Sequence, residues 1–446
     1  MRTVLARAKQ AAVRVVASRP VYRWLPPGGL RTYAALKYHG EQSGQEAVVA
    51  YLRDCRDIPT RPLPTALVAA KALFRAGQDD LLEQALTGLE RRYPGAAAVK
   101  LLRADLLAYQ GDYERAVACA ELADQLRPSP ASIARVVKYG YRVWPTELAD
   151  QAAVDAVRRH PRSAEALWPV AVNCATPEQY DRVAQAWQER SDPAPADLLP
   201  VVRQLATAAS RAGRLDAAAD WYRQGIELLR QGGQSAATLT VTTLAGLGGR
   251  RALEDLCRVL DGAGVPFFFA AGTALGLIRE GRLLGADHDI DVGVFDRDWD
   301  RPALIRLFRQ DPAFDLDEHP QSRKVGLRHR GGAPIDIFPF YEQDGRVWHD
   351  GVFVRWWNTP FTVERREVAG LSLPLPADPE RYLAENYGPD WRTPQPGFDA
   401  FTDDAPNLDV TWPEYQRVHL LRRAYQAMAA GDRAGAEERL RRLEQD

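Results

Sequence analysis

Asp287, Asp289 and Asp291 alternate with other residues in the stretch Asp-His-Asp-Ile-Asp. Successive side chains of a strand point to opposite faces, so the three carboxylates are expected on one face. His288 is then expected on the other face, in a structural role. Two carboxylates about 4 Å apart repel by roughly 4 kcal/mol at an effective dielectric constant of about 20. A divalent cation would offset this repulsion, and the pattern therefore predicts a metal site.

The residues before these aspartates predict a short strand followed by a helix. Val265–Ala271 is apolar and has the length of a strand, and Gly272-Thr273 then interrupts it. We expect Gly272-Thr273 to cap the helix, whose first N–H groups have no partner inside the helix. Such a helix start binds anions, so the pattern predicts a phosphate at Gly272 and Thr273.

Asp336 lies between apolar residues in the later stretch Pro-Ile-Asp-Ile-Phe-Pro-Phe. Apolar flanks of this kind are typical of a buried strand. A strand beside the acidic one would bring Asp336 to the metal site. The alternative is an ordinary aspartate on an edge strand.

A Gly-Thr turn, an apolar-flanked Asp-x-Asp and a later single Asp together resemble the nucleotidyltransferase fold. The finer pattern is similar to the LicD family, which includes the fukutin-related transferases. It runs from Gly-Thr-x-Leu-Gly-x-x-Arg through Asp-x-Asp-Ile-Asp to Asp-Ile-Phe-Pro. The resemblance covers about residues 253–396 and ends in a Tyr-Leu helix and Tyr-Gly-x-x-Trp. His288 departs from the commoner family spelling Asp-Asp-Asp-Ile-Asp.

The resemblance implies transfer of a phospho-group, such as phosphocholine or an alditol phosphate, from a CDP-activated donor. The acceptor would be a hydroxyl of a cell-surface glycan or glycolipid. Asp289 and Asp291 would hold Mg²⁺ or Mn²⁺ on the donor diphosphate, with Asp287 as a further ligand. Asp336, on the adjacent strand, would act as a metal ligand, as the base that accepts the hydroxyl proton, or as both.

Three basic residues are candidates for binding the donor phosphates. Arg279 matches the arginine of the family's Gly-x-x-Arg, and its guanidinium suits either a phosphate or a salt bridge with a carboxylate of the site. Lys324 and Arg328 lie in the strand expected before Asp336. Their alternative role is that of ordinary surface charges.

Two rival functions fit the same residues. The first is a nucleotidyltransferase that moves a nucleotide from an NTP and releases pyrophosphate. The second is a non-catalytic scaffold, in which only the helical repeats described next bind a partner. The intact set of Asp289, Asp291 and Asp336 favours catalysis over the scaffold.

A helix-rich region with a 34-residue period precedes the acidic stretch. Gly77 and Gly111 are 34 residues apart, and Gly213 follows after three further periods. A helix–turn–helix unit of this length resembles tetratricopeptide repeats, which bury their apolar faces only by stacking on one another. The concave face of such a solenoid suits a protein partner or part of the acceptor; otherwise the repeats are a platform for the enzyme.

We therefore predict an N-terminal all-α tetratricopeptide-like solenoid followed by a mixed-sheet domain with the nucleotidyltransferase fold. A hinge is expected at Gln231-Gly-Gly-Gln-Ser-Ala-Ala. The predicted segments are a basic N-terminal segment at 1–40, the repeats at 41–232, the LicD-like domain at 240–411 and C-terminal helices at 412–446.

Composition limits the remaining possibilities. The formal net charge of −1 over 446 residues argues against a nucleic-acid-binding protein. The four cysteines form no Cys-x-x-Cys pair, which favours a reduced cytoplasmic setting. No apolar run is long enough to predict a membrane span. Residues 1–40 contain eight Lys or Arg and no acid, which predicts either a peripheral membrane contact or a solvated first helix.

Overall fold

The computed structural model of the chain describes residue 23 and residues 29–445, except for residues 43, 55–57, 190–194, 233–243, 245–247, 286, 317–322, 396 and 403. Most of the basic N-terminal segment and of the expected hinge lies outside the described residues. Within the described part, no helix is long and apolar enough to cross a membrane.

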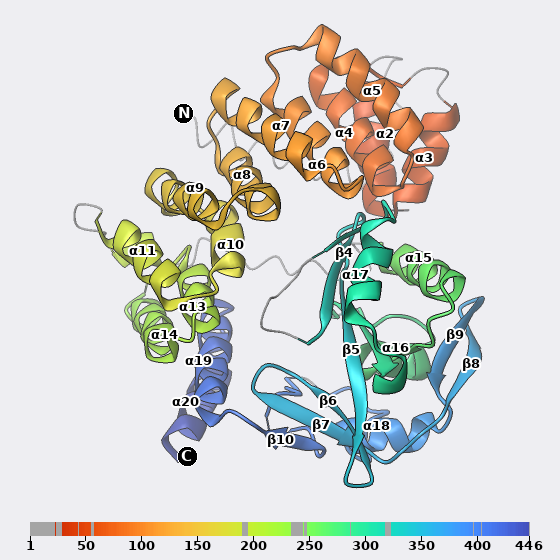
Figure 1. The fold of residues 1–446 in the computed structure, drawn as a ribbon, viewed down its shortest axis with the longest axis vertical. Coiled ribbons are helices and arrows are strands. Elements are labelled where there is room, and N and C mark those ends of the chain that lie inside the picture. The colour runs from red at the N-terminus through yellow and green to blue at the C-terminus, as the bar shows by residue number, and fades with distance from the viewer. Residues whose placement is uncertain are drawn as a thin grey trace.

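Residues 29–232 form an arc of antiparallel helix pairs (Figure 1). The turns of three pairs contain Gly77, Gly111 and Gly213, with φ angles of 67°, 81° and 74°, a region that glycine adopts without a steric penalty. The all-α arrangement predicted from the 34-residue period is confirmed. The pairs are α2 (Gly29–Gln42) with α3 (Gly44–Asp54), α4 (Leu63–Arg75) with α5 (Asp79–Arg92), α6 (Ala97–Tyr109) with α7 (Tyr113–Leu126), α8 (Pro130–Val143) with α9 (Thr146–Arg159), α10 (Ala164–Asn173) with α11 (Pro177–Gln188), and, after the short α12 (Pro195–Leu198), α13 (Val202–Arg211) with α14 (Leu215–Arg230).

Small and branched apolar side chains hold these helices together. Ala69, Ala70 and Leu73 of α4 are fully buried, as are Leu82 and Leu86 of α5. Each fully buried leucine stabilises the fold by about 1.5–3 kcal/mol relative to an exposed one. The small alanine side chains let neighbouring helices approach closely. Each helix therefore packs against its neighbours through one defined stripe of its surface.

The last two helices extend the same array. α19 (Pro413–Ala429) packs against α14, and α20 (Arg433–Gln445) packs against α19. Ala424 is fully buried at this contact, and the Tyr425 hydroxyl donates to the carbonyl of Leu199 at 3.0 Å. Gly225 of α14 lies under the Tyr425 ring, where a Cβ atom would come within 2.8 Å of it. The chain therefore returns to the helical arc after passing through the sheet domain.

A mixed sheet lies between α14 and α19 in the sequence. Its strands run in the order β1-β2-β5-β6-β7-β10, and β3 and β4 extend it on one side of β5. β2 and β5 are parallel, whereas the other neighbours are antiparallel, as predicted for a mixed sheet. The strands are β1 (Phe268–Phe269), β2 (Ile290–Phe295), β3 (Phe314–Leu316), β4 (Val325–His329), β5 (Pro334–Gln343), β6 (Arg346–Asp350), β7 (Val354–Asn358) and β10 (Leu408–Val410).

One face of β2 and β5 forms the core of this domain. Ile290 and Val292 of β2, and Ile335 and Ile337 of β5, are fully buried there. Because strand side chains alternate, the residues between them point to the opposite face. The elements around the sheet are the helices α15 (Gly249–Gly262), α16 (Ala271–Arg279), α17 (Arg301–Arg309) and α18 (Pro379–Tyr387), the short η3 (Asp296–Asp298), and the hairpin of β8 (Val363–Val368) and β9 (Leu371–Pro376).

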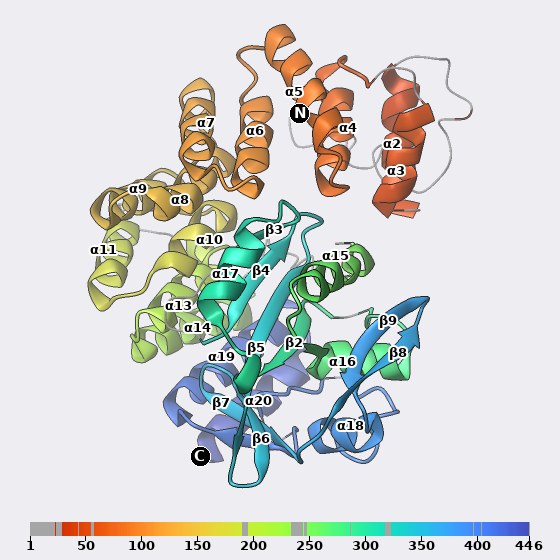
Figure 2. The ribbon, with the colours of Figure 1, turned by 45° about the vertical axis from the view of Figure 1, so that its right-hand side comes forward.

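The β3–β4 end of the sheet docks on the helical arc (Figure 2). Arg330, just after β4, is only 5% exposed and forms an ion pair with Asp79 at 2.5 Å. Its Nε donates to the carbonyl of Phe74 at 2.5 Å, and its guanidinium lies 4.9 Å from the centre of the Phe74 ring. The sheet and the arc are thus joined by a buried, charged contact.

Candidate active site

Parallel pairing places two of the predicted aspartates side by side. In the register of β2 and β5, Asp291 is the direct partner of Asp336. Both residues alternate with the buried core residues of their strands, so both carboxylates leave the sheet on the face opposite the core. Neighbouring strands lie about 4.8 Å apart, which brings the two carboxylates within reach of one ion. The prediction that Asp336 lies on the strand next to Asp291 is confirmed.

Asp287 and Asp289 lie just before β2, which begins only at Ile290. The prediction that all three aspartates belong to one strand is therefore wrong for these two. The N–H of Asp287 donates to the carbonyl of Leu284 in a turn, and the Asp287 carboxylate accepts the N–H of His288 at 3.0 Å. Such local bonds compete with strand pairing. His288 is exposed.

The acidic residues nevertheless form one electrostatic cluster. Burial, followed by repulsion from Asp336 and Asp287, raises the pKa of Asp289 to about 6. Burial raises the pKa of Asp287 to about 6 as well. The pKa of Asp291 is raised well above its usual value by burial and then by Asp289, Asp287 and Asp336. Burial is thus the first reason why these three carboxylates resist ionisation, and for Asp289 and Asp291 the acidic neighbours add to it.

Asp287 lies against the start of α16. A Cβ atom on Gly272 would stand 3.1 Å from Asp287 Oδ2, so glycine leaves room for this carboxylate. Asp287 Oδ2 is buried and accepts no hydrogen bond. Buried carboxylate oxygens normally have a partner, and an ion or a donor group is the usual explanation when the protein supplies none.

Thr273 has a different role from the predicted helix cap. The helix begins at Ala271, so Thr273 is its third residue and Ala270 precedes it. The Thr273 side chain is fully buried, and its Oγ1 accepts the N–H of Asp291 at 2.9 Å. The Ala270 N–H donates to the carbonyl of Asp291 at 3.0 Å. Both backbone polar groups of Asp291 are therefore held by the corner between β1 and α16.

The first turn of α16 keeps the geometry expected for anion binding. Gly272 and Thr273 are its second and third residues, and the N–H groups of a first turn have no partner within the helix. The Ala271 N–H donates to the hydroxyl of Tyr382 at 3.2 Å. A phosphate at Gly272 and Thr273 stays a prediction, with the anion facing their backbone rather than the Thr273 hydroxyl.

Tyr382 also contacts the corner between β1 and α16. The sequence indicated the Tyr-Leu helix that contains this residue but no role for its side chain. Its side chain is 1% exposed, and it reaches α16 from α18. Burial raises the pKa of Tyr382, the bond from Ala271 acts in the opposite direction, and nearby Asp291 raises it further. Tyr382 therefore stays neutral and positions the start of α16.

Of the three basic candidates, the structure brings Lys324 to the carboxylates. Lys324 Nζ lies 2.5 Å from Asp336 Oδ2. Burial alone would lower the pKa of Lys324, but Asp336, Asp289 and Asp291 outweigh this effect and raise it. The ammonium group thus supplies positive charge within the acidic cluster.

Arg279 and Arg328 contact other parts of the domain. Arg279 is the last residue of α16, six residues and about 9 Å along the helix from Thr273. It donates to the carbonyl of Trp391 and pairs with Glu280, both at 3.2 Å, so the salt bridge that it forms is not with an aspartate of the cluster. Arg328 Nη1 donates to the carbonyl of Gly332 in the turn between β4 and β5.

The donor set fits a hard divalent cation. Carboxylates are acceptor-only ligands that Mg²⁺ prefers, and one or two of them suffice when phosphate oxygens complete the coordination. Asp289 and Asp291 repel each other, and the unpaired Asp287 oxygen lies beside them. Among the described residues, no three His, Cys, Asp or Glu side chains are already placed around one point as metal ligands. The metal stays a prediction, with phosphate oxygens of the donor expected to contribute to its coordination.

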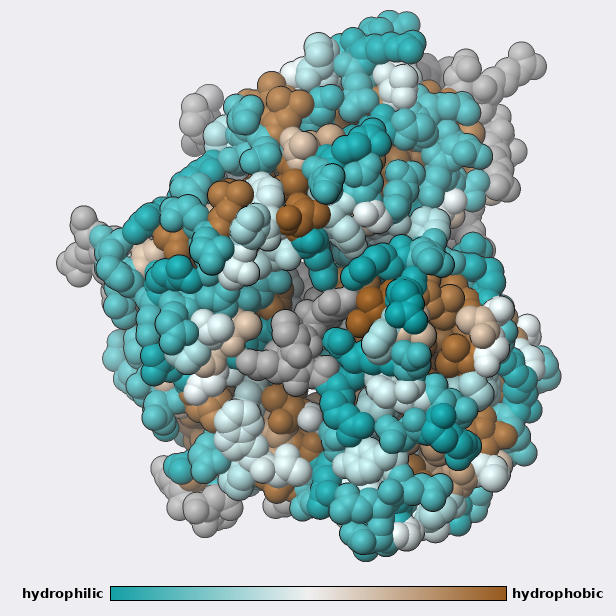
Figure 3. Space-filling view, viewed as in Figure 1, coloured by the Kyte–Doolittle hydropathy of each residue, from teal (hydrophilic) through white to brown (hydrophobic). Residues whose placement is uncertain are grey.

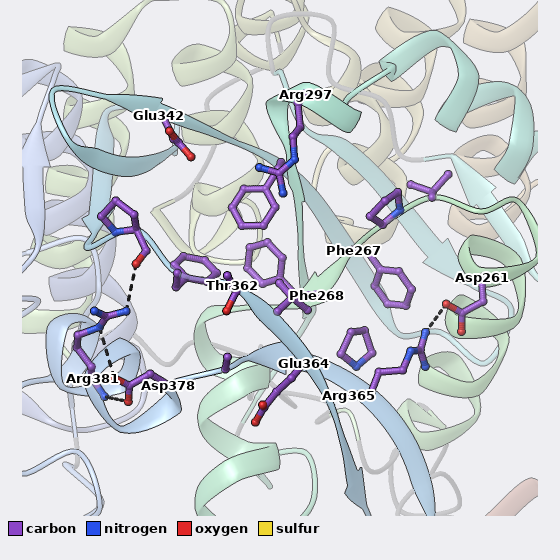
Figure 4. A pocket seen from close by; sticks show the side chains of 18 residues that line it. Asp261, Phe267, Phe268, Arg297, Glu342, Thr362, Glu364, Arg365, Asp378 and Arg381 are labelled. Atoms are coloured by element: carbon purple, nitrogen blue, oxygen red, sulfur yellow. Dashed lines mark hydrogen bonds and ion pairs between the residues drawn. The ribbon is translucent and has the colours of Figure 1, made fainter.

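A separate pocket of about 790 Å³ opens at the other end of β2 (Figure 4). Phenylalanine rings such as Phe268 line it, and the charged side chains around them include the ion pair of Arg365 with Asp261. Phe295 is part of its wall and follows Asp291 by four strand residues, or about 13 Å. The pocket is thus a different feature from the carboxylate cluster.

The carboxylate cluster lies within a part of the chain that is similar to known proteins. Residues 264–378 match the family described as LicD/FKTN/FKRP, nucleotidyltransferase domain. Over 173 residues, the chain is 27% identical to the ribitol-5-phosphate transferase FKTN of Mus musculus, 25% to that of Macaca fascicularis and 24% to that of Homo sapiens. These alignments cover 36% of the chain and 37% of each relative. The LicD resemblance is confirmed for this part of the chain.

Proposed function

Because residues 264–378 form a LicD-family domain, we propose that this chain transfers a phospho-group from a CDP-activated donor to a hydroxyl of a glycan or glycolipid. The phospho-group is of the alditol phosphate or phosphocholine type. The observation that carries the proposal is the paired register of Asp291 and Asp336, with Asp289 and Lys324 beside them. The activity by which the relatives are named, ribitol-5-phosphate transfer, supports this class of reaction.

The residues divide the chemistry between them. Asp289 and Asp291, with Asp287 close by, would hold Mg²⁺ or Mn²⁺, which when bound neutralises charge on the donor diphosphate. Thr273 and the β1–α16 corner fix the backbone of Asp291, so the carboxylate is held in place before the donor arrives. The first-turn N–H groups of α16 would bind a donor phosphate. Such preorganised charge is the main source of catalysis in phosphoryl transfer.

Asp336 would accept the proton of the acceptor hydroxyl. The hydroxyl oxygen forms a new bond to the phosphorus distal to the nucleoside, and the bond from this phosphorus to the bridging oxygen of CMP breaks. Lys324 lies 2.5 Å from the Asp336 carboxylate and compensates its charge before the proton arrives. CMP leaves, and the phospho-alcohol stays on the acceptor.

The test is to identify the products formed from a panel of donors. The full chain is incubated with Mg²⁺ and either CDP-alcohols or NTPs, and the products are resolved by phosphorus NMR and mass spectrometry. We expect CMP from CDP-alcohols, and none from the Asp291→Asn variant. Pyrophosphate from an NTP, with CDP-alcohols untouched, would establish the rival nucleotidyltransferase instead.

A matched control separates loss of the site from loss of an ordinary charge. Asp344 is exposed in the turn between β5 and β6 and has a positive φ of 52°, which asparagine tolerates well. The Asp344→Asn variant changes the same chemical group in the same domain, so we expect it to keep the activity of the unaltered protein.

A further inference from the structure

The first helices of the repeats carry a row of equivalent positions. Lys37, Lys71, Asp105 and Tyr139 are each 34 residues apart and lie on α2, α4, α6 and α8. These four helices pack side by side, α2 on α4, α4 on α6 and α6 on α8. Residues at equivalent positions of stacked repeats form a line across the solenoid. Arg75 is one helical turn beyond Lys71, and both are exposed, so the row widens on α4.

At the α8 end of this row, the cations already bind carboxylates. Lys138 Nζ pairs with Asp315 of the sheet domain at 2.5 Å, and the Asp315 side chain is only 2% exposed. Arg135 donates twice to Asp105, at 2.7 and 2.8 Å. Arg142 donates to the carbonyl of Leu316. This face of the arc therefore binds anionic groups where the chain itself supplies them.

Further along the same face, the cations lack such partners. Within the described part of the chain, Lys37, Lys71 and Arg75 form no ion pair. The pKa of Lys71 is lowered, first by partial desolvation and then by Arg135, Arg75 and Lys37, while Asp105 acts in the opposite direction. Among the described residues, these three cations on α2 and α4 thus have no carboxylate of their own, because the nearby Asp105 is already bound to Arg135.

We propose that Lys37, Lys71 and Arg75 bind a phosphate-bearing polyanionic glycan, the acceptor of the proposed reaction. The identity of the glycan as the acceptor rests on the proposed function. The location of its binding site rests on charge complementarity alone. The three side chains, spread over two helices, match an anionic group that recurs along a chain better than a single small ion. We call these three residues the cationic row.

The position of the docked sheet domain sets the distance that such a glycan must span. Lys324 and Arg330 lie at the two ends of β4, six residues and about 20 Å apart. Lys324 contacts Asp336 of the carboxylate cluster, whereas Arg330 contacts Phe74, the neighbour of Arg75. An acceptor that reaches the carboxylates and the cationic row together must therefore be an extended polymer rather than a short sugar.

Two other polyanions fit this surface less well. The sheet domain docks on α8 through Lys138 and on the end of α4 through the carbonyl of Phe74, so it stands beside the helices that carry the cationic row and hinders the approach of a flat membrane (Figure 1). Single-stranded nucleic acids bind through aromatic stacking platforms as well as charge, and the cationic row of Lys37, Lys71 and Arg75 contains no aromatic side chain. A phosphodiester-linked glycan has no bases to stack, so charged side chains alone are enough to bind it.

The test compares two triple variants of the full chain. The first is Lys37→Ala, Lys71→Ala and Arg75→Ala together. The matched control replaces three exposed arginines of the second helices and their ends by alanine, at positions 91, 92 and 127, which form no ion pair in the described residues. Both variants lose three positive charges, and thermal melting checks that both are folded.

Binding is measured by fluorescence anisotropy with labelled poly(glycerol phosphate) of increasing length. We expect the cationic-row variant to bind about tenfold more weakly and the control variant to bind as the unaltered protein does, with a difference that shrinks at high salt. Neutral dextran, single-stranded DNA and anionic vesicles are measured in parallel. Equal binding by both variants, or binding only of DNA or only of vesicles, would overturn the proposal.

Donor turnover is measured separately in the unaltered protein. If poly(glycerol phosphate) binding depends on the cationic row but no CDP-alcohol yields CMP, the result would support glycan binding by the row and count against the proposed function. CMP release without such binding would be consistent with the proposed function and would refute glycan binding by the cationic row.

Discussion

Replacing Thr273 by valine should damage the active site without leaving a cavity. Valine has nearly the same shape as threonine, and the Thr273 side chain is fully buried. What disappears is the hydroxyl oxygen that accepts the N–H of Asp291 at 2.9 Å. This N–H points to the buried corner between β1 and α16, where water does not replace the lost acceptor. A buried donor left without a partner costs about 1–3 kcal/mol.

This cost is measurable in both stability and activity. For a domain of this size, 1 kcal/mol corresponds to about 2–4 °C, so Thr273→Val should lower the melting temperature by about 3–10 °C. A shift of the Asp291 carboxylate by about 1 Å would reduce kcat by up to about a hundredfold. The assays are differential scanning calorimetry and CMP release from a CDP-alcohol.

Thr273→Ser is the matched control, because it keeps the hydroxyl and removes only a methyl group. We expect it to lose some stability but to retain most of the activity. If Thr273→Val is as active as the unaltered protein, or if Thr273→Ser is equally inactive, the hydroxyl does not position Asp291 and the reasoning is wrong.

Four further predictions follow from the carboxylates, the docking contact and the N-terminal segment. Asp291→Asn should abolish metal-dependent turnover while circular dichroism stays unchanged, and a residual activity above about one per cent would contradict its role. Folding raises the pKa values of Asp287 and Asp289 to about 6, from about 3.9 in the unfolded chain, so the folded protein binds more protons in this range. The stability of the metal-free protein in thermal melts should therefore fall as the pH rises from about 4 to 7. Asp289→Asn should make this fall less steep. Arg330→Met should weaken docking of the sheet on the arc by about 1–3 kcal/mol, because the partly exposed Asp79 loses its ion pair and the carbonyl of Phe74 loses a donor; unchanged protease sensitivity between arc and sheet would contradict this. Sedimentation with anionic vesicles should depend on residues 1–40 and fall with salt, and equal recovery with neutral vesicles would contradict this.

The parts of the fold that depend on local pattern were predictable from the sequence. The 34-residue period follows from a helix–turn–helix unit that repeats with glycine in its turn, and Gly77 and Gly111 do have positive φ. The apolar flanks of Asp291 and Asp336 identified two buried strands. Their placement on adjacent strands was supplied by the resemblance to a known fold, because flanking residues alone do not choose the neighbour of a strand. The parallel direction of the two strands was not predicted.

The features that depend on tertiary contacts were not predictable in the same way. A Gly-Thr pair after a strand is compatible with a cap, but β1 ends at Phe269 and the helix begins before Thr273, which directs the hydroxyl to Asp291 instead. A local turn at Asp287 shortened the expected strand.

The docking of the sheet on the arc illustrates the same limit over a longer range. Arg330 and Asp79 are 251 residues apart, and neither lies in a motif that indicates a partner. A buried ion pair between two domains depends on the shape of both surfaces. Sequence patterns describe each surface separately, so they do not predict which charge meets which.

If the carboxylate cluster directs attack to the phosphorus distal to the nucleoside, an isotope measurement will show it without knowledge of the acceptor. The full chain is incubated with Mg²⁺ and a CDP-alcohol in water enriched in oxygen-18, so that water replaces the acceptor hydroxyl. Mass spectrometry then locates the label. We expect oxygen-18 in the released phospho-alcohol and unlabelled CMP. Oxygen-18 in CMP would show attack on the other phosphorus and would refute the proposed direction of attack.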